Sequence, residues 1–331
     1  MRPLGTNSPP KTSVVANSLY FAHLLKRMNS IIHYTQCPVC SSFLLQPVFN
    51  VKDHSVSGKS FSIYECAECT LRFTQDAPDI HSIGQYYKSE NYISHTNTSE
   101  GFINRLYQIV RKRTLRQKRK LISKITGRNK GTLLDVGSGT GSFVNEMKQN
   151  SWEVTGLEPD EDARQVARQS FGCELFSIDT LFHLPENTFD VITLWHVLEH
   201  VHDLHGYLRQ FKKLLKEDGR LVVAVPNYTS FDASVYKEFW AAYDVPRHLY
   251  HFSPLSMKLL ISKNGMRIVK YKPMWFDSFY VSFLSSKYKH AHLHGRGKTN
   301  WLAASWNGFV SNLEALLDRK KCSSVIYIIS K

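Results

Sequence analysis

The stretch LLDVGSGTG, residues 133–141, runs from a short apolar segment directly into a glycine-rich loop. The apolar part predicts a buried strand, and a helix is expected to follow over 142–149. Gly137, Gly139 and Gly141 let the backbone of the loop approach a ligand closely. A strand, a glycine loop and a helix in this order occur in many α/β enzymes, so the loop alone is a weak signal.

The sequence after this loop alternates between strand-like and helix-like segments. Strands are expected at 152–157, 173–178, 189–194 and 220–225, with helices at 162–170 and 207–216. Two further strands, at 266–272 and 323–330, complete the set. This alternation predicts an α/β fold with a doubly wound, Rossmann-like sheet of seven strands. The region 274–320 is too long for a hairpin loop and is expected to fold over the substrate side of the sheet.

Acidic residues lie at the ends of three predicted strands. Asp135 precedes the first glycine by two positions, Glu158 ends the second strand, and Asp179 ends the third. Ligands bind at the carboxyl edge of open α/β sheets, where parallel strands end. The three carboxylates are therefore expected to face one ligand.

The combination of LLDVGSGTG, GLEP, FDVITLWHVLEHV and LKEDGRLVVAVPN resembles the class I S-adenosylmethionine-dependent methyltransferases. The resemblance implies that the cofactor's methionine end is held by Asp135, Gly137, Ser138, Gly139 and Gly141. It implies that Glu158 binds the ribose, that Asp179 lies beside adenine, and that Leu194 lines the cofactor. LKEDGR departs from the family's usual proline-glycine-glycine turn, far from this site.

The segment LWHVLEHVHDLH, residues 194–205, contains four histidines. His196 and His200 are four residues apart, which would suit two metal ligands on one helical face. A metal site needs three or four ligands with supporting partners, and the sequence does not identify the others. We therefore expect His196 to border the cofactor, and Glu199 and His200 either to face the acceptor or to orient the next helix.

A second polar cluster, WAAYDVPRHLYHFS, covers residues 240–253. The chain also resembles the zinc-bearing sugar C-methyltransferases and the quinone-biosynthesis O-methyltransferases. In the former, the position of His248 is an active-site histidine preceded by glutamate, whereas this chain has Arg247. We expect His248 to be the catalytic base, with His196 as second choice. Arg247 either grips an anionic acceptor or pairs with Asp244 to fix the loop.

Four of the six cysteines form two C-x-x-C pairs, Cys37/Cys40 and Cys66/Cys69. The N-terminus lacks the pattern of a secretion signal, so disulfides are not expected. Two such pairs suit a tetrahedral Zn²⁺ site, with redox or vestigial cysteines as the alternative. The sequence predicts a structural zinc ribbon over 31–80.

The formal net charge is +14, and residues 101–130 contain eleven Lys or Arg and no acidic residue. This region predicts a basic helix that binds RNA, a phosphorylated substrate or a membrane surface, or is simply solvated. Residues 1–30 are expected to be a disordered leader, 81–130 a tyrosine-rich arm with the basic helix, and 131–331 the methyltransferase domain. No apolar run is long enough for a transmembrane helix, and a cytoplasmic location is expected.

The resulting hypothesis is S-adenosylmethionine-dependent methyl transfer to a small molecule such as a sugar or quinone precursor. Two alternatives are an RNA methyltransferase, with the ribbon and basic helix holding phosphates, and a non-catalytic protein that binds the cofactor. The sequence does not identify the acceptor or the oligomeric state.

Overall fold

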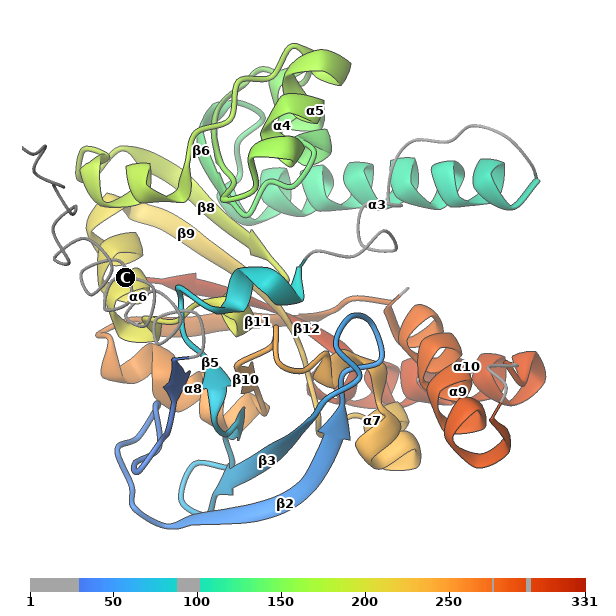
Figure 1. The fold of residues 1–331 in the computed structure, drawn as a ribbon. Coiled ribbons are helices and arrows are strands. Elements are labelled where there is room, and N and C mark those ends of the chain that lie inside the picture. The colour runs from blue at the N-terminus through green and yellow to red at the C-terminus, as the bar shows by residue number, and fades with distance from the viewer. Residues whose placement is uncertain (1–29, 88–101, 276, 296–298) are drawn as a thin grey trace, which may run out of the picture.

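The computed structural model describes residues 30–87, 102–275, 277–295 and 299–331 (Figure 1). The expected leader therefore lies outside the described residues, apart from Ser30. A six-stranded sheet forms the centre, in the order β11-β12-β9-β8-β6-β7. Its strands are β6 (Gly131–Val136), β7 (Trp152–Leu157), β8 (Phe189–Trp195), β9 (Leu215–Pro226), β11 (Arg267–Pro273) and β12 (Ser324–Ser330).

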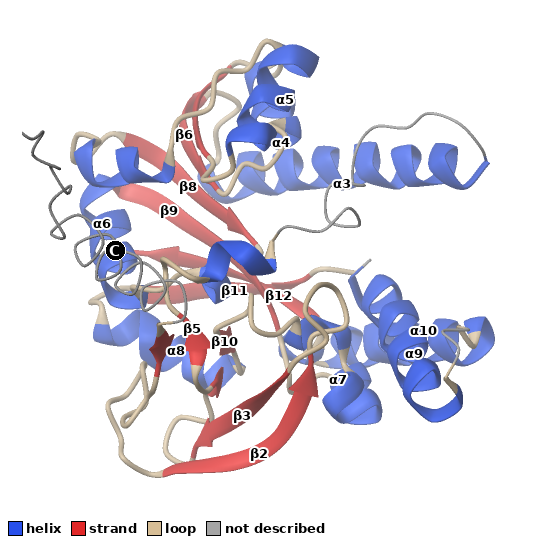
Figure 2. Ribbon diagram, in the orientation of Figure 1, coloured by secondary structure: helices blue, strands red, loops and turns tan. Residues whose placement is uncertain are grey.

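Four neighbouring strands of this sheet, β7, β6, β8 and β9, are parallel. Strand β12 runs antiparallel to both β9 and β11. One face is covered by α3 (Phe102–Thr126), α4 (Ser142–Lys148) and α5 (Glu161–Phe171), through buried residues such as Ile122 and Val144. The other is covered by α6 (Leu204–Leu214) and α8 (Pro254–Lys263), through residues such as Leu208 and Leu260. Figure 2 shows the helices on both faces, which confirms the doubly wound fold.

The expected third strand, 173–178, is reduced to one isolated bridge between Leu157 and Phe176. The Phe176 N–H donates to the Gly156 carbonyl at 2.9 Å, and the Phe176 carbonyl accepts from the Glu158 N–H at 2.9 Å. Ser177 then caps a 3₁₀ helix, η2 (Ile178–His183), by accepting from the N–H of Asp179. The prediction of seven strands was wrong here because this serine cap turns the edge segment into a helix.

The predicted ribbon forms two small sheets. Strands β2 (Leu45–Lys52), β3 (Ser60–Cys66) and β4 (Arg72–Thr74) are antiparallel, and β1 (Ile31–Ile32) pairs with β5 (Ala77–Pro78). The larger sheet gains a fourth strand, β10 (Tyr250–His251), from the second polar cluster. Because β10 belongs to the second half of the chain, the ribbon is joined to the region after β9 by backbone hydrogen bonds.

The region 274–320 forms two helices, α9 (Asp277–His294) and α10 (Trp301–Leu317), followed by η6 (Arg319–Lys321). These helices pack against each other and against α7 (Phe231–Tyr236) and the short helix η5 (Ala241–Tyr243), at the side of the molecule (Figure 1). The first residue of α9, Asp277, reaches the site described below.

The structure describes part of the predicted arm and the basic helix. The arm begins with η1 (Ile83–Tyr86), and the tyrosine-rich remainder over 88–101 lies outside the described residues. The basic helix is confirmed as α3, which packs through Leu121, Ile122 and Ile125. Within the described ranges, none of the helices combines the length and hydropathy that a membrane span requires.

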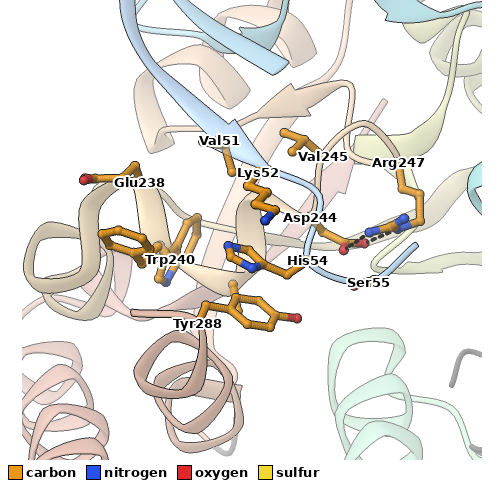
Figure 3. A pocket seen from close by; sticks show the side chains of 12 residues that line it. Val51, Lys52, His54, Ser55, Glu238, Trp240, Asp244, Val245, Arg247 and Tyr288 are labelled. Atoms are coloured by element: carbon orange, nitrogen blue, oxygen red, sulfur yellow. Dashed lines mark hydrogen bonds and ion pairs between the residues drawn. The ribbon is translucent and has the colours of Figure 1, made fainter. Parts of the chain in front are cut away.

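One buried arginine joins the ribbon, the arm and the loop before β10. The Arg247 side chain is 1% exposed, and Figure 3 shows its paired bonds to Asp244. Arg247 Nε and Nη2 donate to the two Asp244 oxygens at 3.0 and 2.6 Å. Arg247 Nη2 also donates to Asp53 at 3.1 Å, and Arg247 Nη1 donates to the Tyr86 carbonyl at 2.9 Å. All three nitrogens are therefore engaged within the protein, which favours loop fixation over an acceptor grip.

Replacing Arg247 by alanine is expected to lower the free energy of unfolding by roughly 3–5 kcal/mol, because two carboxylates would lose their buried partner. Chemical denaturation should measure this loss, with Arg209→Ala as the control, because Arg209 is exposed on α6. An Arg247→Ala protein as stable as the Arg209→Ala protein would contradict this account.

Candidate active site

The glycine loop after β6 folds back onto the end of β7. The N–H groups of Gly137 and Ser138 both donate to the Leu157 carbonyl, at 2.8 and 2.9 Å. Gly137 has φ +70°, and a Cβ there would lie 2.4 Å from Cγ2 of Val197. A side chain at position 137 would therefore clash with the segment that follows β8, so glycine is needed for the loop to pack against this segment.

Asp135 lies buried at the end of β6, as predicted. Its carboxylate accepts a 2.6 Å hydrogen bond from Oγ1 of Thr193 on β8. Burial raises the pKa of Asp135 to about 6. Lys118 of α3 contributes a positive charge near this carboxylate, and its Nζ lies 4.2 Å from the ring centre of Trp195. Sequence reasoning did not single out Lys118, which was hidden among the eleven basic residues.

Glu158 and the glycine loop are brought together. One Glu158 oxygen accepts from the N–H of Gly139 at 2.7 Å, and the other accepts from the N–H of Asp160 at 3.0 Å. Burial raises the pKa of Glu158. Asp179 is exposed at the start of η2, where its carboxylate accepts from the Ser177 hydroxyl at 3.1 Å. Leu194 is fully buried near the end of β8.

The short helix η3 (Leu198–His200) lies against the loop that contains His248. The Leu249 N–H donates to the Glu199 carbonyl at 2.8 Å. The imidazoles of His200 and His248 meet edge to face, with ring centres 4.6 Å apart. One potential ligand atom from each of Glu199, His200 and His248 lies within 4.8 Å of the other two. Three predicted catalytic residues from two distant segments thus form one cluster, here called the Glu-His-His cluster.

His196 forms the outer part of the same site. Its Nε2 lies 2.9 Å from Asp277 at the start of α9, and its Nδ1 lies 3.4 Å from Glu199. Burial alone would lower the pKa of His196, but these two carboxylates raise it to about 10. At neutral pH His196 is therefore a cation, which makes it unsuitable as the second choice of base. Asp277 was missed because it lies in the insertion, far along the sequence.

Each of the two cluster histidines has a backbone carbonyl next to its Nδ1. His200 Nδ1 lies 3.0 Å from the Arg247 carbonyl, and His248 Nδ1 lies 2.8 Å from the Ala242 carbonyl. A carbonyl oxygen can only accept, so Nδ1 of His248 donates to Ala242, whereas Nδ1 of His200 also lies 2.9 Å from the Tyr87 hydroxyl, which can donate to it. Burial lowers the pKa of His200 to about 4, which keeps this ring neutral. His248 Nε2 lies 4.0 Å from the Asp244 carboxylate.

A cavity of about 330 Å³ lies beside His196. It runs between α3 and the connection from β11 to α9, and Trp195 and Asp277 line one end. Basic side chains are frequent in its wall, which includes Lys118, Lys120, Lys124 and Lys272. Trp275, Met274 and Ile326 provide apolar surface. The cavity combines apolar walls with an excess of positive charge.

The four ribbon cysteines lie together, as predicted. The sulfur atoms of Cys37 and Cys69 are 3.5 Å apart, and those of Cys40 and Cys66 are 3.4 Å apart. All four lie within 4.8 Å of one another. Four sulfurs bound about 2.3 Å from one tetrahedral Zn²⁺ ion lie roughly 3.8 Å apart, so the cluster has suitable dimensions.

Curated proteins that this chain resembles include methyltransferases of quinone biosynthesis. It is 37% identical over 109 residues to a ubiquinone biosynthesis O-methyltransferase of Glaesserella parasuis, covering 30% of this chain and 46% of that protein. It is 29% identical over 121 residues to a demethylmenaquinone methyltransferase of Tropheryma whipplei, covering 35% and 50%. The chain thus spans about half the length of these curated relatives.

A solved structure with a similar chain is the magnesium protoporphyrin IX methyltransferase of Synechocystis PCC 6803. It is 14% identical, with a TM-score of 0.49, and the match covers 76% of this chain and all of that one. Residues 107–271 match the family model described as a methyltransferase domain. The chain therefore belongs to the methyltransferase-domain family through these residues.

Proposed function

We propose that this protein transfers a methyl group from S-adenosylmethionine to a small-molecule acceptor. The observation that carries the proposal is the arrangement at the carboxyl edge of the sheet. There, the glycine loop with Asp135 and Glu158 lies next to the segment that leads from β8 to the Glu-His-His cluster. In this proposal the loop and Glu158 bind the cofactor, with Asp179 beside the adenine, and the cluster faces the acceptor.

The reaction needs the acceptor to be aligned with the methyl group, and it needs a proton to be removed from the acceptor. The acceptor's lone pair attacks the sulfonium methyl group in line, and the electrons of the methyl–sulfur bond move to sulfur, giving S-adenosylhomocysteine. A hydroxyl or amine acceptor must also lose a proton. We assign the loss of this proton to the Glu-His-His cluster, with His248 as the essential group, because an imidazole suits general-base catalysis and His248 lies against His200 of the cluster. The cationic His196 would orient Glu199 rather than accept the proton.

The cavity beside His196 supports an acceptor with an anionic group. Four lysines line it together with one aspartate, and within the described residues these lysines have no ion pair with a carboxylate. Burial lowers the pKa of Lys118 to about 8, so an anion beside it would favour the charged form. The two curated relatives act, by name, in ubiquinone biosynthesis and on demethylmenaquinone, which favours a quinone precursor or a similar metabolite.

The ribbon is proposed to hold a structural Zn²⁺ ion through Cys37, Cys40, Cys66 and Cys69. The N–H groups of Val39 and Cys40 point to the Cys37 sulfur, at 3.4 and 3.5 Å, which would stabilise a thiolate ligand. Four thiolates fill a tetrahedral site and leave no open position for a substrate. Thiolate sites persist in reducing compartments, which favours a cytoplasmic location.

Replacing Glu158 by alanine should weaken binding of S-adenosylmethionine at least about tenfold. Two hydrogen bonds to the ribose would be lost, each worth on the order of 1 kcal/mol or more. Calorimetry should measure the affinity, with Glu153→Ala as the control because Glu153 is exposed on β7. Unchanged affinity in a folded Glu158→Ala protein would exclude the proposed ribose contact.

Replacing Cys66 by serine should remove the zinc ion from the ribbon, since one of the four thiolates is lost. Elemental analysis of protein purified without chelator should show one zinc fewer per chain than in the unmodified protein. The matched control is Cys173→Ala, which changes a buried cysteine outside the ribbon. Equal zinc content in the Cys66→Ser protein would refute the site.

Replacing His248 by alanine should slow turnover at least about a hundredfold, because proton transfer contributes typically ~10²–10⁴-fold. Cofactor affinity should change little. The assay measures S-adenosylhomocysteine formed with a small-molecule extract from cells that lack this gene, in which the acceptor should accumulate. His183→Ala, at an exposed position on η2, is the control. Near-normal turnover by the His248→Ala protein would show that His248 is not essential.

A further inference from the structure

Helix α10 carries its large apolar side chains on the outside. Seven of them are between 49% and 89% exposed: Trp301, Leu302, Trp306, Phe309, Leu313, Leu316 and Leu317. The buried residues of the same helix are small, namely Ala304, Gly308, Ser311 and Ala315. A helix of a globular protein normally shows the opposite pattern, with its large apolar side chains facing the core. The seven exposed side chains are here called the α10 stripe.

The small residues are explained by the close packing of α10 on its neighbours. A Cβ at position 308 would lie 2.8 Å from a ring carbon of Phe279 on α9. The Ser311 hydroxyl donates to the buried carboxylate of Asp232 on α7 at 2.8 Å. The inner side of α10 is therefore engaged within the chain, and the helix cannot turn its large side chains inward without losing these contacts.

The α10 stripe is larger than the apolar patches that the surface of a monomer normally exposes. A large aromatic side chain presents about 150–250 Å², so the three aromatic residues of the stripe expose roughly 300–450 Å². With its four leucines the stripe reaches the order of 800 Å², which is the area that one partner buries in a standard protein interface. Apolar patches above a few hundred Å² mark interaction sites, so the stripe has the size of an interface.

The spacing of the stripe fits a partner helix. Five of its residues follow one another at alternating steps of four and three positions: Leu302, Trp306, Phe309, Leu313 and Leu316. A repeat that averages about 3.5 residues is typical of helices that pair in a coiled coil. A helix that lies on a membrane surface instead carries Lys or Arg on its polar side. The one charged residue of α10 is Glu314, which anionic headgroups would repel.

The order of the side chains along the stripe fits a second copy of the same chain. The two tryptophans lie in the N-terminal half of α10, and three of the four leucines lie in the C-terminal half. In an antiparallel pair, the tryptophans of each copy lie opposite leucines of the other, so that larger and smaller side chains interdigitate. A parallel pair would instead place Trp306 of one copy against Trp306 of the other.

We propose that two copies of this protein associate through the α10 stripe, as an antiparallel pair of helices related by a two-fold axis. Each contact in such an interface occurs twice. Helix α10 lies at the side of the molecule, where a second copy can approach it (Figure 1). The insertion that contains it lies outside residues 107–271, which match the family model, so the interface belongs to this insertion and not to the shared domain. The inference does not depend on the proposed reaction.

The first experiment measures the mass of the unmodified full chain in solution. Sedimentation velocity at micromolar concentrations is expected to show a dimer. A monomer throughout this range would overturn the proposal. The basic residues of η6 follow the end of α10, so vesicles that contain phosphatidylglycerol are tested as well. A monomer that sediments with these vesicles would identify a membrane as the occupant of the stripe and would also overturn the proposal.

A matched pair of variants tests whether the stripe is the interface. Leu313→Glu should raise the dissociation constant of the dimer at least about a hundredfold, because the two-fold axis places the new charge in the interface twice. Leu255→Glu is the control, since Leu255 on α8 is 51% exposed and Leu313 is 49% exposed. Circular dichroism checks that both variants fold. A dimer that Leu313→Glu does not weaken, or that Leu255→Glu weakens equally, would overturn the stripe as the interface.

Crosslinking tests the antiparallel order of the two helices. The Leu302→Cys and Leu316→Cys proteins are oxidised mildly, alone and as a mixture, with the unmodified protein as the control because its own cysteines are buried or half-buried. We expect a disulfide between the two variants in the mixture and little crosslinking of either variant alone. Crosslinking within each variant alone, with none between them, would overturn the antiparallel pair.

Discussion

The buried charge of Arg247 is the constraint on which the arrangement of the site depends. A guanidinium removed from water is stable only if its donors are satisfied and its charge is compensated. Here the partners come from three parts of the chain: Asp53 of the ribbon, the Tyr86 carbonyl of the arm, and Asp244 of the same loop. The neighbouring residue, His248, is consequently held against η3. The ribbon is therefore part of the scaffold of the candidate site and not a detached module.

The hydrogen bonds around β4 and β10 also fix the ribbon to the loop that contains His248. Thr74 donates through its N–H to the Leu249 carbonyl at 2.9 Å and through its hydroxyl to the His248 carbonyl at 2.7 Å. Both groups are buried, where an unmade hydrogen bond is costly. A zinc ion in the ribbon would thus stabilise the backbone of the His248 loop from a distance, through β4. This coupling explains how a metal site without an open position can matter for chemistry elsewhere.

Much of this architecture was predictable from local sequence patterns. The apolar strands, the glycine loop and the paired cysteines each carry their signal within a few residues, and the structure confirms them. Two features were not predictable. The segment 173–178 has a strand-like pattern, but the cap at Ser177 ends it after one bridge. The meeting of Glu199 with His248, and of His196 with Asp277, depends on tertiary packing between segments that the sequence separates widely. The pKa of His196 follows from that packing, so its cationic state was also hidden.

The central claim is that cofactor and chemistry meet at the carboxyl edge, between the glycine loop and the Glu-His-His cluster. A crystal structure of the complex with S-adenosylhomocysteine tests this claim most directly. The account predicts that the ribose hydroxyls contact Glu158 and that the cofactor's sulfur faces the side of the site that holds Glu199 and His248. A complex in which the sulfur points away from these two residues, or in which the cofactor binds outside the Asp135 loop, would contradict it.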